Sequence, residues 1–164
     1  MPGGEESGVH LPLPVLDRLI DERPEEPEEG VPSYATALRA TLEAVRRDLQ
    51  WLLNYRRSDE ELRSRDTGEI GRSLATYGIP DLTSVNLKSE REKERVRRSI
   101  EAAVRRFEPR LDRVRVVPVE KGPQESVTHF RIDALLRVDP APEPVSFDTA
   151  VQWQDREVRV ERLF

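Results

Sequence analysis

The chain has 164 residues, of which 36% are hydrophobic and 36% are charged, and its formal net charge is -5. It has no cysteine and only two histidines, His10 and His129, which excludes disulfides, thiol-ligated zinc and multi-histidine metal sites. The apolar runs are short and the first ten residues lack the basic and apolar regions of a signal peptide, so we expect a cytoplasmic protein without a membrane span.

The negative charge is concentrated near the N-terminus. Residues 1–32 carry nine acidic and two basic side chains, whereas residues 33–164 carry 25 basic and 23 acidic ones. Six of the 13 prolines also lie in residues 1–32, and the stretch 21–32 reads DERPEEPEEGVP. Proline, glycine and like charges disfavour packed structure, so we predict a flexible acidic arm over 1–32 and a single domain over 33–164.

A short apolar cluster lies within the predicted arm, at residues 13–20 (LPVLDRLI). Leu16 and Leu19 have helical spacing, and Asp17 and Arg18 lie between them. An apolar patch beyond a charged linker serves to dock the arm, either on its own domain or on a partner. The sequence leaves both possibilities open.

Two amphipathic helices are predicted. The first begins after Ser33, a plausible N-cap, and its apolar residues recur every three or four positions until about Asn54, while Arg39, Arg46, Arg47 and Asp48 are assigned to its solvent side. The second begins at Ser89, has acidic residues in its first turns and arginines in its last, and should end at Glu108 because proline follows.

Between the helices, residues 55–87 contain three glycines and Pro80, which predicts a long structured loop with one or two helical turns near 70–76. After them, apolar and polar residues alternate in segments that predict three or four strands, with Pro118 indicating an edge strand or a bulge. Helices followed by a meander predict an α+β fold: two main helices packed on a small antiparallel sheet of three to four strands, with an N-terminal extended arm.

Motifs for catalysis or cofactor binding are not found. Gly68 and Gly71 lack the Lys-Ser/Thr of a phosphate-binding loop, and His129 flanks a strand without a nucleophile motif. We therefore expect no catalytic residue, no metal and no cofactor.

The segment 88–115 holds eleven basic and six acidic residues. Because the acids are interleaved and aromatic residues do not alternate with the bases, this pattern favours an ion-paired helix face over a nucleic-acid site. A weak electrostatic fit to an acidic protein surface remains open.

The corner after the second helix, Glu108-Pro109-Arg110, is the most distinctive local feature. Proline restricts its own φ and the conformation of Glu108, so the two charges are expected to project from a rigid backbone and to suit protein recognition. The alternative is a helix terminus in which Arg110 neutralises the last carbonyls and pairs with Glu108.

Four segments together resemble one family, the TssE subunits of type VI secretion baseplates, which are related to the baseplate wedge proteins of contractile phages. The segments are 45–54 (VRRDLQWLLN), 77–82 (YGIPDL), 106–111 (RFEPRL) and 130–136 (FRIDALL). Leu16-Asp-Arg-Leu19, with Asp21 and Pro24, is similar to the N-terminal segment of TssE and favours the secretion subunit over a phage protein.

The resemblance implies a structural role. Members of this family join the wedge with TssF, TssG and TssK around a hub that carries the spike, and they template the first ring of the TssB and TssC sheath. Their contact with the membrane complex is indirect. Carried over to this chain, sheath docking falls on Glu108, Pro109 and Arg110, with strand exchange at an exposed sheet edge, and wedge docking falls on Leu16, Asp17, Arg18 and Leu19.

The family is also labelled lysozyme-like, which raises an enzymatic alternative. Glycosidases need two carboxyl groups across a cleft, and phage-type lysozymes place an aspartate nine positions after the catalytic glutamate, a spacing that no glutamate of this chain has. Glu108 and Asp112 lie among arginines that keep carboxylates ionised. We predict no muramidase activity.

Overall fold

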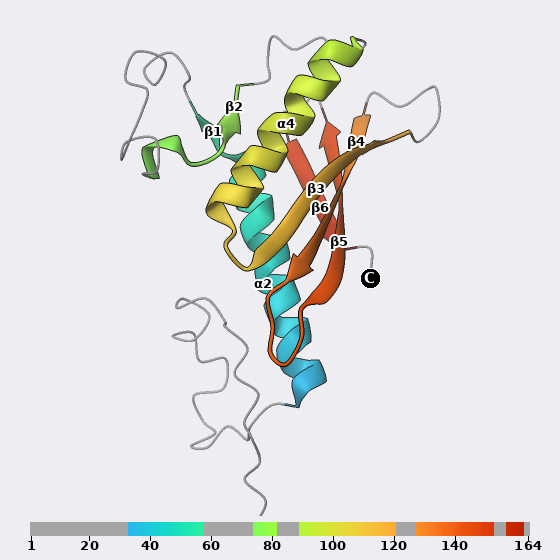
Figure 1. Ribbon diagram of the computed structural model, residues 1–164. Helices are drawn as coiled ribbons and strands as arrows, with labels where there is room; N and C mark the ends of the chain where they lie inside the picture. The colour runs from blue at the N-terminus through green and yellow to red at the C-terminus, as the bar shows by residue number, and fades with distance from the viewer. Residues whose placement is uncertain (1–32, 58–73, 82–88, 121–126, 153–156, 163–164) are drawn as a thin grey trace, which may run out of the picture.

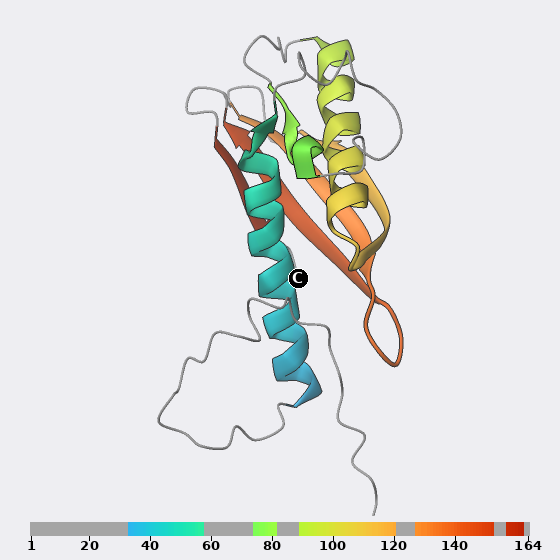
Figure 2. The same cartoon turned by 90° about the vertical axis from the view of Figure 1, so that its left-hand side faces the viewer.

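The computed structural model describes residues 33–57, 74–81, 89–120, 127–152 and 157–162. Two helices cover one face of a four-stranded antiparallel sheet, which confirms the predicted α+β class. Figure 2 shows the helices side by side over that face. The arm 1–32, with its docking segment 13–20, lies outside the described residues, as do the last two residues, 163–164.

The first helix, α2 (Tyr34–Asn54), has the predicted bounds. The Ser33 Oγ accepts a hydrogen bond from the Thr36 amide at 3.3 Å, which satisfies one of the free donors at the helix start. Its apolar stripe is buried, and Val45, Leu49 and Leu53 are fully inaccessible to solvent. Each such side chain contributes about 1.5–3 kcal/mol through removal of apolar surface from water.

The second helix, α4 (Glu90–Phe107), ends where Pro109 predicts. Ser89 occupies the N-cap position, but its side chain makes no capping hydrogen bond; its carbonyl accepts from the amides of Glu92 and Lys93, at 3.0 Å each. The predicted ion-paired face is present: Glu94 pairs with Arg97 and Arg98, both at 2.7 Å. These two arginines, through their hydrogen bonds, lower the pKa of Glu94 to about 2.

The sheet is a meander in the order β3 (Leu111–Val119), β4 (Val127–Leu136), β5 (Glu143–Gln152) and β6 (Glu157–Arg162). Alternate residues of each strand point under the helices, and Phe130 and Phe147 are fully buried at the centre. Pro118 lies on an edge strand, as predicted, but the bulge is elsewhere, between Asp112 and Arg115, where Arg113 adopts a φ of 50°. The bulge restores Val114 and Val116 to the buried face.

A small parallel sheet was not predicted. Strands β1 (Arg56–Arg57) and β2 (Ile79–Pro80) pair beside α4 near the C-terminal end of α2, and a short 3-10 helix, η2 (Leu74–Thr76), precedes β2 (Figure 1). Gly78 makes this pairing possible because its φ is +97° and a Cβ there would lie 2.3 Å from the Tyr55 carbonyl oxygen. Ile79 then enters the core with 1% exposure.

In the part of the chain that the structure describes, no helix combines the length and the apolar character that a membrane span needs.

Candidate partner-binding site

The corner between α4 and β3 is a tight, hydrogen-bonded turn. The Glu108 amide continues the helical pattern by donating to the Val104 carbonyl at 2.9 Å, and the Glu108 carbonyl accepts from the Leu111 amide at 3.1 Å. Pro109 is exposed at the apex. The Arg110 carbonyl accepts from the Arg137 amide at 2.8 Å, which attaches the corner to the end of β4.

Glu108 and Arg110 form an ion-pair network with Asp48 of α2. The Arg110 Nε donates to Glu108 Oε1 at 2.6 Å and its Nη2 donates both to Glu108 Oε2 and to Asp48 Oδ2, the latter at 2.6 Å. Side-chain exposure is 4% for Glu108, 14% for Arg110 and 28% for Asp48. Burial acts to lower the pKa of Arg110, but hydrogen bonds and charges of Glu108 and Asp48 outweigh it, so the pKa is raised.

This arrangement corrects two expectations from the sequence. Glu108 and Arg110 do not project as a pair of free charges, because they face each other in the interior, and Asp48 does not lie on a fully solvated side of α2. One donor is left over: Arg110 Nη1 is buried and has no hydrogen-bond partner among the described residues. Buried donors are almost always paired, so this nitrogen is an unusual unused donor within the network.

An aromatic row connects α2 to the end of α4. Tyr55 packs edge-on against Tyr77 at 5.6 Å between ring centroids, and Tyr77 packs similarly against Phe107 at 5.2 Å. Burial, followed by the charges of Asp48 and Glu108, raises the pKa of Tyr77. The row therefore runs close to the ion-pair network.

Two large aromatic side chains are exposed at the C-terminal end of α2, Trp51 in its last turns and Tyr55 at its C-cap. Trp51 is 55% exposed and Tyr55 is 58% exposed, and the Arg47 guanidinium lies 5.3 Å from the centre of the Trp51 ring. Tryptophan, tyrosine and arginine are the residues most enriched where proteins bind one another.

The outer edge of β6 is covered by side chains of α2. The Asn54 side-chain amide accepts from the Val158 amide and donates to the Val158 carbonyl, at 2.8 Å each. The Gln50 side chain accepts from the Val160 amide at 2.8 Å and donates to the Val158 carbonyl as well. Two side-chain amides thus replace the backbone of a neighbouring strand.

The outer edge of β3 is covered by α4. Arg105 donates to the Val114 carbonyl at 2.7 Å, Arg97 donates to the Val116 carbonyl at 3.3 Å, and Glu101 accepts from the Val116 amide at 3.2 Å. The expectation of an exposed edge ready for an added strand is therefore wrong for these parts of β3 and β6: a new strand must first displace helix side chains.

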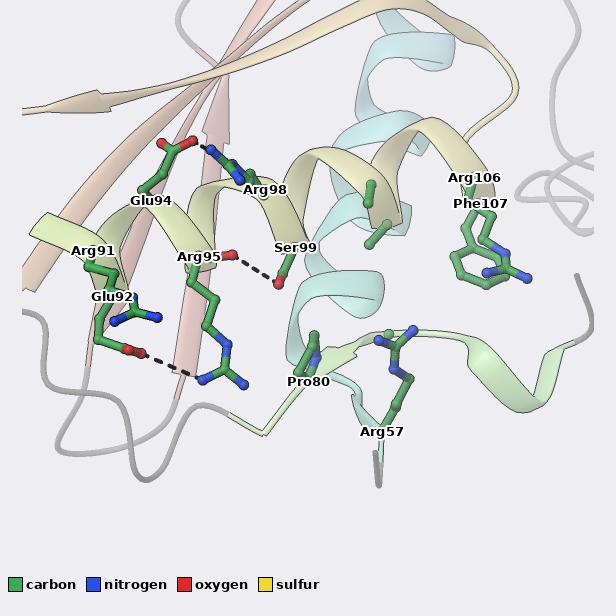
Figure 3. Close-up of a pocket in the computed structure, with 13 residues that line it drawn as sticks. Arg57, Pro80, Arg91, Glu92, Glu94, Arg95, Arg98, Ser99, Arg106 and Phe107 are labelled. Atoms are coloured by element: carbon green, nitrogen blue, oxygen red, sulfur yellow. Dashed lines mark hydrogen bonds and ion pairs between the residues drawn. The ribbon is translucent and has the colours of Figure 1, made fainter. Parts of the chain in front are cut away.

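A groove of about 690 Å³ separates α4 from β1 and β2 (Figure 3). Five arginines and two glutamates line it, which leaves an excess of three positive charges. Its remaining lining includes small residues such as Gly78, Ser99 and Ala102.

The other predicted site residues lie elsewhere. Leu16, Asp17, Arg18 and Leu19 are outside the described residues. His129 lies in β4 opposite Ala150. Within the described ranges no group of three or more histidine and acidic side chains is arranged to hold a metal ion.

A small α+β domain with a buried ionic corner, exposed aromatic residues and a basic groove has the features of a protein-binding subunit. A family model described as "Baseplate wedge protein gp25" matches residues 39–141, and the chain belongs to this family. Comparisons with curated proteins and with solved structures find no significant match. The family is structural and not enzymatic, so the chain is a baseplate wedge component of a contractile tail or injection system.

Several functional residues were missed from the sequence. Asp48 completes the network with Glu108, and Gln50 and Asn54 cover the sheet edge. Gln50 and Asn54 are polar residues among the apolar residues 49–53, and this was the available signal, whereas Asp48 follows two arginines and gives no such signal. Their partners lie more than 60 positions away, which the sequence does not reveal.

Proposed function

We propose that this wedge protein is the TssE subunit of a type VI secretion baseplate. Its membership of the gp25 family supports the wedge assignment. The N-terminal segment Leu16-Asp-Arg-Leu19, with its likeness to TssE, favours the secretion subunit over a phage subunit. In this function the chain works in the bacterial cytoplasm, at a baseplate docked to the inner membrane.

The proposed partners are the wedge subunits TssF, TssG and TssK, the sheath subunits TssB and TssC, and the hub. Baseplate wedge proteins interact with other baseplate and sheath components, which supports this set in general terms. The chain joins the wedge and then templates the first ring of the sheath.

The corner residues Glu108, Pro109 and Arg110 carry the sheath contact in this proposal. The supporting observation is Arg110, whose Nε and Nη2 are held by carboxylates while Nη1 keeps an unused donor. Two fixed nitrogens hold the guanidinium in one orientation beside the exposed Pro109 ring, so a sheath subunit that docks on the corner would meet a rigid surface. Glu108 positions Arg110, and it is too buried to form a large contact with a partner itself.

The test is Arg110→Lys, which keeps the charge near Glu108 but removes the planar fork. We expect the variant to fold and to nucleate sheath poorly when it is combined with purified wedge and sheath subunits. Arg137→Lys is the matched control, because Arg137 is adjacent to the corner, is 63% exposed and makes only a 3.7 Å pair with Asp112.

A second control separates binding from stability. Ile132→Val removes one methylene from a fully buried position and should cost about 1 kcal/mol without touching the corner. Normal sheath nucleation by a folded Arg110→Lys variant would mean that the corner is only an internal brace. If Ile132→Val also fails to nucleate sheath, the defect of Arg110→Lys is explained by lower stability of the domain and not by a lost contact.

The second candidate is a wedge protein of a phage or extracellular contractile tail, which the family match equally allows. Co-purification decides between the two. Recovery of TssF, TssG and TssK supports the secretion baseplate, whereas recovery of tail-tube and phage baseplate proteins without them supports the alternative.

The segment 13–20 is proposed to dock on the wedge. Deleting residues 1–24 should weaken wedge binding more than it lowers the thermal midpoint, because an apolar segment beyond a charged linker is suited to binding a partner. A fall in the midpoint with unchanged wedge binding would instead show that the segment packs on its own domain.

A further inference from the structure

The proposed function leaves the groove between α4 and the small β1–β2 sheet unused. Its walls are well separated in sequence: Arg91, Arg95 and Arg106 come from α4, whereas Arg57 comes from β1 (Figure 3). The side chains of Arg95 and Arg57 extend from opposite walls toward the space between them.

The positive charge of this groove is only partly neutralised. Arg98 pairs with Glu94 at 2.7 Å, but Arg95 reaches Glu92 only at 3.7 Å. Arg91 and Arg106 form no ion pair with residues that the structure describes, and Arg106 lies over the Phe107 ring at 5.1 Å. Charges of one sign in a concave surface reinforce one another and attract an oppositely charged ligand.

We propose that this groove binds an acidic segment of a partner protein. Ala102, Ser99 and Gly78 supply little side-chain bulk, so an extended chain can lie between the walls with its carboxylates near the arginines. Arginine suits this role because its planar fork pairs with a carboxylate through two parallel hydrogen bonds.

Only part of the acidic arm of the same chain is too close to Ser33 to reach this groove. The arm joins the domain at Ser33, at the opposite end of the 21-residue helix α2 from the groove, a separation of about 30 Å at 1.5 Å per residue. Glu25 to Glu29 lie four to eight residues before Ser33 and extend at most about 27 Å. These four glutamates therefore fall short of the groove within one chain, whereas the five acidic residues before them have enough intervening chain to reach it.

A protein ligand is favoured over nucleic acid. The one aromatic ring among the described lining residues, Phe107, already lies against the guanidinium of Arg106. Binding of single strands generally requires aromatic rings that are free to stack on bases.

The test uses the full chain and a fluorescein-labelled peptide of eight glutamates as the probe, read by anisotropy at low and moderate salt. We expect binding that weakens with salt. The double variant Arg91→Glu/Arg95→Glu should weaken it by at least about ten-fold, because two attractive charges become repulsive. The control is Arg39→Glu/Arg159→Glu, which changes the net charge equally at exposed positions of α2 and β6.

Equal loss in both double variants would overturn the proposal, since it would reflect net charge alone. Absence of peptide binding at low salt would also overturn the proposal. So would an oligothymidine strand that binds more tightly than the peptide and whose binding depends on Arg91 and Arg95 in the same way. This surface is separate from the corner, so failure here leaves sheath docking through Arg110 unaffected, and circular dichroism checks that each variant is folded.

Discussion

Replacing Arg110 by methionine should destabilise the domain strongly. The substitution preserves most of the side-chain volume but removes the only cation that contacts both Glu108 and Asp48 among the described residues. Glu108 then remains 4% exposed with its carboxylate unpaired. Removing one partner of a buried ion pair costs about 3–5 kcal/mol, because the remaining charge has lost both water and its counter-ion.

That loss is a large fraction of the stability of an ordinary domain, which is about 5–15 kcal/mol. A domain of this size loses roughly 3–5 °C in its thermal midpoint for each kcal/mol, so the midpoint should fall by about 10 °C or more. Urea unfolding followed by circular dichroism measures the change, with a lower midpoint concentration and an unchanged slope.

A double-mutant cycle distinguishes this explanation from simple loss of packing. Adding Glu108→Gln to Arg110→Met removes the unpaired charge, so the double variant should be less destabilised than the sum of the two single variants by about 1.5 kcal/mol or more. Arg137→Met, at an exposed position nearby, should stay within about 0.5 kcal/mol of the parent. If Arg110→Met unfolds at the same urea concentration as the parent, the network does not stabilise the fold and the reasoning is wrong.

Three further predictions concern the sheet edge, the small sheet and the aromatic row. The double change Gln50→Ala/Asn54→Ala uncovers the β6 backbone and should promote dimers or larger species on size-exclusion chromatography, whereas an unchanged monomer would show that the edge is protected in another way. Gly78→Ala should cost about 2–3 kcal/mol in urea unfolding, because a Cβ would lie 2.3 Å from the Tyr55 oxygen at a φ of +97°, and an equally stable variant would contradict the close approach. Because the pKa of Tyr77 is raised above 10.0, its contribution to the stability of the domain is present below pH 10.0 and is lost as pH rises through the folded-state pKa. Phenolate absorbance should show that Tyr77→Phe lacks one tyrosine that ionises at a higher pH than an ordinary tyrosine.

The parts of the fold that depend on local patterns were predictable. The apolar period of α2, the Ser33 cap and Pro109 after α4 determine where both helices begin and end, and the alternation in β4 and β5 determines which residues face the core. The β1–β2 pair was not predictable, since two residues carry no detectable period and the pairing depends on a glycine whose φ only the folded structure shows.

The sequence predicted the turn at Glu108-Pro109-Arg110, but not the direction in which its charges point. The rigid turn at Glu108-Pro109-Arg110 follows from proline geometry alone, whereas the direction of its charges depends on Asp48, which α2 brings to the corner from 62 positions away. A carboxylate on a neighbouring helix made pairing inside the protein more favourable than projection into solvent.

For the charged residues too, the sequence determined one part of the outcome and the tertiary structure the other. The sequence by itself established that the negative charge lies in residues 1–32, that the rest of the chain has nearly equal numbers of acidic and basic groups, and that no cysteine or histidine cluster is available for chemistry. Only the tertiary structure decided which of these charges are used internally and which remain for partners. It pairs Arg110 within the corner and uses Arg97 and Arg105 to cover the edge of β3, yet leaves the arginines between α4 and β1 facing a groove. The physical reason is that ion pairing depends on distances between elements, and these distances are set by the packing of the helices on the sheet.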